Sequence, residues 1–209
     1  MRVFKKPEVR KSEILDAAEK LFAAKGYEKA TVNDILAAVN IAKGTFYYYF
    51  KSKEDVLNTI VQRRMDEGVE RAQAVAANPN LEVHEKLLAV IMALKSQNPM
   101  QENLPAILHE PDNVQLHQKM LIESVLRLSP ILSDVVEEGI KQGIFNTTFP
   151  MESIEILLTA ALVLFDEAYF QWQPDETTVK VSAFLCAMER ILGAEAGSFA
   201  VFAKVFAEK

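Results

Sequence analysis

Apolar residues recur every three or four positions along almost the whole of this chain, and that spacing restricts the folds open to it. Between Ile14 and Phe22, for example, they fall at i, i+1, i+4, i+7 and i+8, which is one face of an α-helix. No segment combines strict alternation of apolar and polar residues with paired turn residues, as a β-hairpin would. The chain is therefore predicted to be all-α.

Prolines at the edges of the apolar stretches set most of the expected helix boundaries, because a helix tolerates proline in its first turn and resists it in its interior. We expect helices at residues 7–25, 32–39, 42–49, 52–77, 81–97, 102–109, 112–128, 130–143, 151–172 and 175–192, with a further short one at 195–207.

Half of the 209 residues are hydrophobic, enough to bury a substantial core in one domain or in a small domain joined to a larger one. The single cysteine, Cys186, excludes an intramolecular disulfide framework and fits a reducing cytosol. The N-terminus lacks the apolar core and cleavage site of a secretory signal. The longest nearly unbroken apolar run, Ile156 to Phe165, is shorter than the ~20 residues of a membrane span. We therefore expect a cytoplasmic protein with no membrane partner.

Charge is distributed unevenly along the chain. Residues 1–64 carry 13 Lys and Arg against 8 Asp and Glu, whereas residues 65–209 carry 10 against 21, for a net charge of −6. A basic head on an acidic body is the pattern of a DNA-contacting module attached to a domain that does not touch DNA. Chance surface charge is the alternative interpretation of this feature taken alone.

Residues 31–49 have the pattern of two short helices joined by a tight turn. Thr31 can cap the first helix, and Asp34 lies three residues on, where its carboxylate can reach back to the cap. Asn40 tolerates the positive φ that a sharp turn needs. Two such helices, braced by a longer first helix, form the DNA-binding helix-turn-helix.

The second of these short helices carries groups suited to the major groove of DNA. Its residues Lys43, Gly44, Thr45, Tyr47, Tyr48 and Tyr49 offer a cation, a close backbone approach, a hydroxyl and three phenolic donors. Phe46 and Phe50, one turn apart, are expected to face the core. The alternative is an aromatic-rich helix in an ordinary interior, which would leave several phenolic hydroxyls in need of partners.

Residues Thr31 to Leu57, with the sequence "TVNDILAAVNIAKGTFYYYFKSKEDVL", resemble the tetracycline-repressor (TetR) family of bacterial regulators. The later stretch "LSDVVEEGIKQGIF" resembles the family's regulatory region more loosely. The resemblance implies a homodimer whose N-terminal three-helix heads (residues 1–54) bind a palindromic double-stranded DNA operator. Helical-bundle bodies (residues 55–209) would dimerise and accept an unidentified small-molecule effector.

The resemblance also implies roles for individual residues. Lys43, Thr45, Tyr47 and Tyr48 match base- or phosphate-contacting positions, and Thr31 and Lys53 match phosphate contacts. Two residues depart from the family pattern. Asn40 stands at a turn position that is often Gly, and Ala42 replaces the usual capping Ser, which removes a cap worth roughly 1 kcal/mol.

The C-terminal half supplies candidates for a dimer interface and a ligand pocket. The expected helix 151–172 is apolar on every side, so a partner subunit could cover one face, although a buried core helix in a monomer has the same pattern. The candidate interface residues are Leu158, Leu162, Phe184, Leu185 and Met188. The candidate pocket residues, suited to an apolar or cationic molecule, are Met92, His109, Met120, Phe165, Tyr169 and Trp172.

Signals of catalysis are missing from the sequence. The three histidines are His84, His109 and His117, and the last two are eight residues apart with Pro111 between them, so one helix cannot present both as metal ligands. No Gly-rich phosphate loop or Gly-x-Ser-x-Gly motif occurs. We expect no enzyme activity, catalytic residue, metal or cofactor. The predicted function is a DNA-binding transcriptional regulator, a repressor released by its ligand; the alternative is a helical small-molecule-binding module that does not act on DNA.

Overall fold

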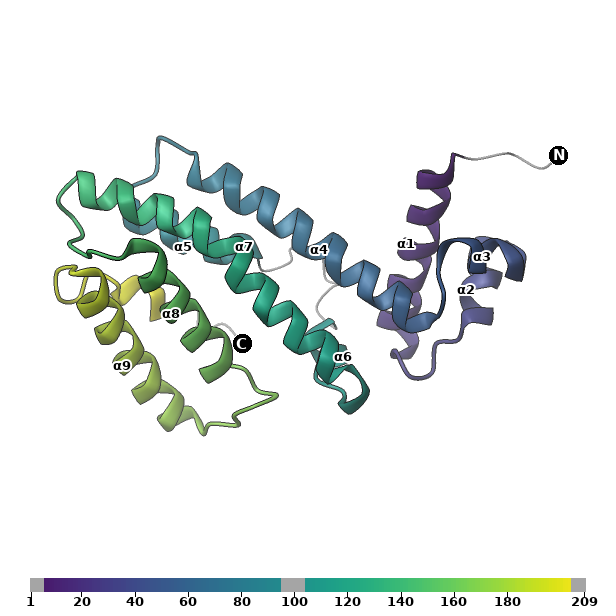
Figure 1. The fold of residues 1–209 in the computed structure, drawn as a ribbon. Helices are drawn as coiled ribbons and strands as arrows, with labels where there is room; N and C mark the ends of the chain where they lie inside the picture. The colour runs from purple at the N-terminus through teal and green to yellow at the C-terminus, as the bar shows by residue number, and fades with distance from the viewer. Residues whose placement is uncertain (1–5, 95–103, 204–209) are drawn as a thin grey trace. The chain divides into compact units, whose positions relative to one another are not determined.

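The computed structural model describes residues 6–94 and 104–203, and within them it contains helices and turns and no strand (Figure 1). The predicted all-α fold is confirmed. The α-helices are α1 (Pro7–Lys25), α2 (Val32–Val39), α3 (Lys43–Tyr49), α4 (Lys53–Ala76), α5 (Val83–Leu94), α6 (Leu104–Leu108), α7 (Val114–Lys141), α8 (Pro150–Leu164) and α9 (Pro174–Leu192). Two 3₁₀ turns, η2 (Pro111–Asn113) and η3 (Ala200–Phe202), complete the described elements.

The chain divides into two compact units. Unit 1 comprises Met1–Asp66 and Ser96–His117, and unit 2 comprises Glu67–Lys95 and Gln118–Lys209. Helices α4 and α7 therefore each begin in unit 1 and end in unit 2. The functional division at residue 54 follows the sequence resemblance, and it stays a prediction beside this structural one.

In unit 1, α1 packs against α2, α3 follows α2, and the first turns of α4 lie beside α1 (Figure 1). Helical spacing puts one face of α1 in the core, and α2, α3 and α4 each contribute apolar residues to the same interior. Burying these side chains is the main stabilising contribution to so small a cluster of helices. The buried residues are Ile14, Leu15, Ala18, Phe22, Ile35, Phe46, Phe50, Val56, Leu57, Ile60 and Val61.

Carboxylates of α1 bind guanidinium groups of α4 at the edge of this core. Glu19 accepts hydrogen bonds from Arg64 at 2.7 and 3.2 Å and pairs with Arg63 at 2.9 Å. Asp16 pairs with Arg63 at 2.7 Å. Burial alone would lower the pKa of Arg63, but its hydrogen bonds to Glu19 and Asp16 outweigh that effect and raise it. The three-helix cluster is thus attached to α4 by ion pairs as well as by apolar packing.

In unit 2, Lys86 of α5 pairs with Glu138 of α7, and α8 and α9 form an antiparallel hairpin (Figure 1). Helix α9 buries one residue per turn, which gives a single continuous inner stripe. At the C-terminal side, Phe199 lies 5.9 Å from Phe145 and 4.9 Å from His84, measured between ring centroids. The buried residues of α9 are Val181, Leu185, Met188 and Leu192.

Two helix boundaries differ from the prediction. The expected helices 112–128 and 130–143 are one helix, α7, with Pro130 in its interior. A proline inside a helix costs one hydrogen bond and about 3 kcal/mol. Pro130 lies on the exposed side of α7, while Leu128, Ile131 and Leu132 next to it are buried, and their burial outweighs that cost.

Helix α8 ends at Leu164, well short of the expected residue 172. The Asp166 carboxylate accepts a hydrogen bond from the amide of Ala168 at 2.8 Å, and the Asp166 carbonyl accepts one from the amide of Phe170 at 2.9 Å. The side-chain bond of Asp166 competes with the helical pattern, and the bond from Phe170 closes a separate turn. Trp172 then folds back and donates its indole N–H to the Leu164 carbonyl at 2.8 Å.

Apart from the segment 195–207, the remaining predicted helices are present with small shifts at their ends. Residues 95–97, 102–103 and 204–207 of the expected helices lie outside the described residues. At 195–207 the described part holds the 3₁₀ turn η3 in place of most of the expected helix. Among the described residues no helix is long and apolar enough to cross a membrane.

Candidate nucleic-acid interface

The N-terminus of α2 is fixed by a reciprocal capping box. The Thr31 hydroxyl accepts a hydrogen bond from the Asp34 amide at 3.1 Å, and the Asp34 carboxylate accepts one from the Thr31 amide at 2.9 Å. Lys25 also donates to the Asp34 carboxylate, at 2.7 Å. The hydrogen bond from Lys25, followed by those from Thr31, lowers the pKa of Asp34 to about 2. The predicted cap is confirmed.

A tight turn connects α2 to α3. Asn40 adopts the left-handed conformation, with φ 53° and ψ 55°, and the Ile41 amide donates to the Leu36 carbonyl at 3.1 Å. Asparagine tolerates this conformation better than most residues, which accounts for Asn40 at the turn. Ala42 precedes α3 and makes no side-chain cap, as the substitution of the usual serine predicts.

Helix α3 is anchored by two phenylalanines one turn apart. Phe46 and Phe50 are almost completely buried, and their ring centroids lie 5.9 Å apart. Residues between them on the helix must point elsewhere, because successive side chains are about 100° apart. Tyr47 is 48% exposed and Tyr48 is 77% exposed.

The rest of the predicted DNA-contacting set on α3 has mixed exposure. Lys43 and Gly44 are exposed, while Thr45 and Tyr49 are half-buried. The Lys43 ammonium lies 5.9 Å from the centroid of the Tyr47 ring, and the Tyr48 and Tyr49 rings meet edge to face at 4.9 Å. One face of α3 thus presents a cation and phenolic hydroxyls to solvent, and such groups bind phosphates and base edges.

Lys53, predicted to contact phosphate, is held inside unit 1. Its ammonium donates to the Tyr27 carbonyl at 2.9 Å and lies 4.1 Å from the centroid of the Tyr27 ring. Burial raises the pKa of the Tyr27 hydroxyl, and the charge of Glu54 adds to that effect. A phosphate contact by Lys53 would have to share the ammonium with this carbonyl.

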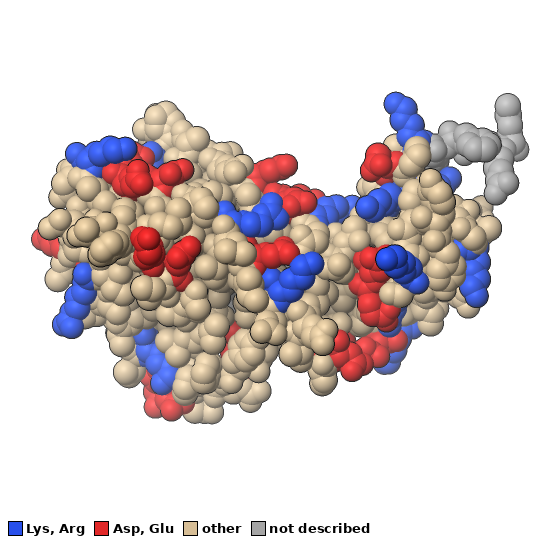
Figure 2. Space-filling view, in the orientation of Figure 1, with Lys and Arg blue, Asp and Glu red and all other residues tan. Residues whose placement is uncertain are grey.

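Lys and Arg side chains surround the α1–α3 cluster on the face shown in Figure 2, with Asp and Glu among them. Cations within unit 1 engage several of its acids: Arg10 binds Glu13, Lys25 binds Asp34, and the arginines of α4 bind Asp16 and Glu19. Sequence reasoning missed the pairing between α1 and α4, because its partners are about 45 residues apart and no local pattern joins them.

The predicted pocket residues are divided between the two units, and their grouping around one ligand stays a prediction. Met92, Met120, Phe165, Tyr169 and Trp172 belong to unit 2, and His109 belongs to unit 1. Trp172 is already covered by its own neighbours: Phe170 stacks on it at 5.0 Å, and the Lys180 ammonium lies 3.8 Å from the ring centroid.

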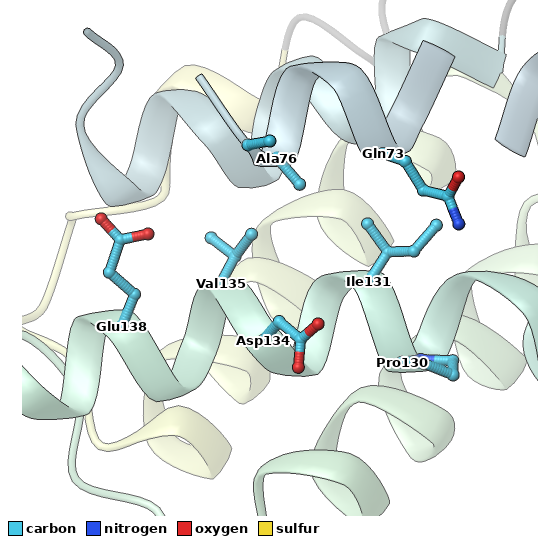
Figure 3. Close-up of a pocket in the computed structure, with 8 residues that line it drawn as sticks. Gln73, Ala76, Pro130, Ile131, Asp134, Val135 and Glu138 are labelled. Atoms are coloured by element: carbon cyan, nitrogen blue, oxygen red, sulfur yellow. The ribbon is translucent and has the colours of Figure 1, made fainter. Parts of the chain in front are cut away.

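A groove of about 400 Å³ lies between the end of α4 and α7 (Figure 3). Its floor is apolar, and the carboxylates of Asp134 and Glu138 line it as well. Glu138 is bound by the buried ammonium of Lys86 at 2.6 Å, whereas Asp134 is exposed. The other lining residues are Gln73, Ala76, Ala77, Pro130, Ile131 and Val135.

The candidate dimer-interface residues also fall into two groups. Leu158, Leu162 and Phe184 are half-buried, and Phe184 meets Phe165 edge to face at 5.7 Å. Leu185 and Met188 are buried inside the single subunit, because they lie on the inner stripe of α9. The assignment of these five residues to a dimer interface stays a prediction.

Two family models match this chain. The model of bacterial regulatory proteins of the tetR family matches residues 14–60, and the model of a tetracyclin repressor-like C-terminal domain matches residues 93–187. The Fatty acid metabolism regulator protein of Bacillus subtilis (strain 168) is 29% identical over 166 residues, covering 77% of this chain and 81% of that protein. The probable acrEF/envCD operon repressor of Escherichia coli (strain K12) is 25% identical over 166 residues, covering 72% and 71%.

A solved structure has a related architecture. The transcriptional regulator of the TetR/AcrR family from Thermobifida fusca YX-ER1 is 27% identical, with a TM-score of 0.55 over 85% of this chain and 96% of that one. The outward-facing α3 behind a capped helix and a tight turn, together with these likenesses, defines a DNA-binding transcriptional regulator. A binding module that does not act on DNA is therefore disfavoured. The chain belongs to the TetR family.

Proposed function

We propose that this regulator is a repressor that binds a palindromic operator as a homodimer and is released by a small-molecule effector. The single observation that carries the proposal is that α3 has one buried and one exposed face. Phe46 and Phe50 are buried, while Lys43, Tyr47 and Tyr48 face solvent. A dimer would place two such helices in successive major grooves, about 34 Å apart.

The exposed faces of α8 and α9 support the dimer. On α9, Val179, Ala183, Cys186 and Ala187 recur at helical spacing and are all exposed, and Val179 is 68% exposed. On α8, Ile156 is 60% exposed. Exposed apolar faces on adjacent helices are typical of an interface, and two copies would bury them in a four-helix bundle around a two-fold axis.

The groove between α4 and α7 is the site that we propose for the effector. Its floor is apolar, and two carboxylates line it. Glu138 pairs with Lys86, whereas no ion pair among the described residues involves Asp134. A ligand with an apolar body and a positively charged group fits this groove better than a carboxylate ligand, which Asp134 would repel. The B. subtilis relative's name refers to fatty acid metabolism. The negative charge of the groove argues against a free fatty acid as the effector of this chain.

Release requires that the effector bind one conformation of the protein more tightly than the one that binds DNA. Helix α4 begins beside α1 and ends at the groove, so it belongs both to the DNA-binding end and to the effector site. A ligand in the groove would select a conformation of α4 in which the two α3 helices no longer match successive major grooves.

The experiment tests whether α3 is the helix that contacts the bases of DNA, which we call the reading helix. It compares an exposed tyrosine on α3 with an equally exposed tyrosine elsewhere. Duplexes selected from a random pool by the purified protein, and DNA upstream of its own gene, serve as probes in fluorescence anisotropy. Tyr47→Ala and Lys43→Ala are each expected to weaken binding at least tenfold, about 1.4 kcal/mol. Tyr169→Ala is the control, because Tyr169 is 46% exposed, almost as much as Tyr47, and lies in unit 2.

Salt supplies a second readout from the same experiment. The affinity of the wild type should fall steeply as salt rises, because phosphate contacts release counterions, and Lys43→Ala should flatten that slope by about one ion. Equal affinities for Tyr47→Ala, Lys43→Ala and the wild type would overturn the assignment of α3 as the reading helix.

A further inference from the structure

Two of the three histidines of the chain meet in unit 1. His109 directly follows α6, and His117 lies in the first turns of α7. Their ring centroids are 4.9 Å apart, the rings are tilted by 45°, and each has a ring nitrogen within 4.8 Å of one in the other. No helix could present them together, and the chain brings them together across a turn.

The segment between the two histidines is held by hydrogen bonds of its own. The buried side-chain amide of Asn113 donates to the Ile107 carbonyl at 2.8 Å, and the Asn113 backbone amide donates to the Glu110 carbonyl at 2.9 Å. The His109 amide donates to the Pro105 carbonyl at 3.0 Å. These bonds hold the backbone that carries the two imidazoles before any ligand arrives, which favours a preorganised binding site.

The surroundings of the pair suit a cation. His117 is buried and His109 is exposed, so an ion could enter from solvent on the side of His109. Glu110 and Asp112 lie in the sequence between the two histidines, and no Lys or Arg lies between them. Negative charge in this turn favours a divalent cation beside the imidazoles.

We propose that His109 and His117 form a binding site for a divalent transition-metal ion of the zinc and nickel type. Imidazole nitrogen is a preferred ligand of these ions, and hard cations such as Mg²⁺ prefer oxygen. The two histidines supply two of the ligands, and oxygen ligands complete the coordination. The site does not depend on the proposed repressor function, and its test involves no DNA.

The experiment measures uptake of Zn²⁺ by the full chain in competition with a chromophoric chelator. The wild type is expected to take up one ion per chain. His109→Gln and His117→Gln should each weaken binding about tenfold or more, because each removes a ligand. His84→Gln and Cys186→Ser are the matched controls, since His84 packs against Phe145 and Phe199, and Cys186 is exposed on α9.

Thermal unfolding gives an independent readout. Zn²⁺ should raise the melting temperature of the wild type and of both controls, and it should raise that of His109→Gln less, because an ion that binds only the folded state stabilises it in proportion to its affinity. If the buried His117→Gln variant does not fold, the exposed His109→Gln variant decides the question. A wild type that takes up no Zn²⁺ at micromolar concentration, or a His109→Gln variant that binds as tightly as the wild type, would overturn the proposal.

Discussion

On α3, neighbouring residues face opposite environments, the core on one side and solvent on the other. Phe46 and Phe50 hold the helix to the core, and Tyr47 and Tyr48, one and two positions after Phe46, point to solvent. The 100° rotation per residue produces this separation without any special backbone geometry. Substitutions on the outer face should therefore change DNA binding without changing the fold.

Gly44 offers a sharp test of that separation. Its φ is not positive, and a Cβ added to it would meet no atom within 4 Å, so the fold of the free protein does not require glycine there. Gly44→Ala should leave the melting temperature unchanged or raise it, because alanine favours helix over glycine by up to about 1 kcal/mol. DNA affinity in the anisotropy assay should nevertheless fall, because the new methyl group would separate α3 from the DNA backbone.

The control for this prediction is Gly139→Ala on α7. There a Cβ would lie 2.4 Å from a ring carbon of Phe145. This variant should therefore lose about 1–3 kcal/mol of unfolding free energy and unfold at a lower temperature. A Gly44→Ala variant that binds DNA as tightly as the wild type would show that Gly44 does not approach the DNA closely.

Single residues differ in how far the sequence predicts them. The outward tyrosines follow from helical geometry alone, and the structure places them as expected. The contact of Lys53 with the Tyr27 carbonyl joins residues 26 positions apart, and the approach of His109 to His117 needs a turn stapled by Asn113. Neither has a periodic signal, because both depend on tertiary packing.

At the scale of helices, local signals predict starts better than ends. The Thr31 cap and the Asn40 turn were predictable because their partners lie within a few residues. Pro130 was expected to break a helix, and it lies inside α7 because burial on the opposite side decides the outcome. Helix α8 ends early because Asp166 and Trp172 bond the local backbone, a competition that apolar periodicity does not record.

The cap of α2 makes a prediction about pH. The folded protein has a pKa of about 2 for Asp34, below the ordinary value of 3.8, so the carboxylate contributes stability at pH values above 3.8. That contribution is lost as pH falls through 3.8 towards 2. Thermal unfolding of the wild type and of Asp34→Asn between about pH 6 and pH 2 should show a gap in melting temperature that closes as acid is added.

The comparison needs a carboxylate outside the cap. Asp134→Asn on α7 removes an exposed carboxylate that makes no helix cap. It loses the same negative charge as Asp34→Asn, so it shows the effect of that charge alone. A gap between wild type and Asp34→Asn that stays constant over the whole pH range would contradict the role assigned to the hydrogen bonds from Lys25 and Thr31.

At the scale of the whole molecule, charge and apolar surface are divided along the chain. The basic surplus lies in residues 1–64, which carry α1, α2 and α3, and the acidic surplus lies in the remainder. Repulsion between DNA phosphates and the acidic part favours contact through the basic part alone. The exposed apolar residues of α8 and α9 lie in unit 2, so the surfaces proposed for DNA and for the second subunit are separate.

The outer face of α9 decides whether two subunits associate through it. Ala183 is exposed, and it lies one turn from Val179 and from Ala187 on the same face, opposite the buried Leu185. Ala183→Arg would place a charge in the middle of the proposed interface, where an unpaired buried charge costs about 3–5 kcal/mol. Sedimentation equilibrium should therefore find a dimer for the wild type and a monomer for this variant at the same micromolar concentration.

Ala74→Arg on α4 supplies the matched control, because Ala74 is also an exposed helical alanine and lies outside the proposed interface. It should remain dimeric. The monomeric variant should also lose most of its affinity for a palindromic operator while keeping weak binding to a half-site, since each subunit retains its own α3 and two half-sites reinforce each other only when the heads are joined. A dimeric Ala183→Arg variant with wild-type affinity would exclude α9 from the interface and leave its exposed stripe to another partner.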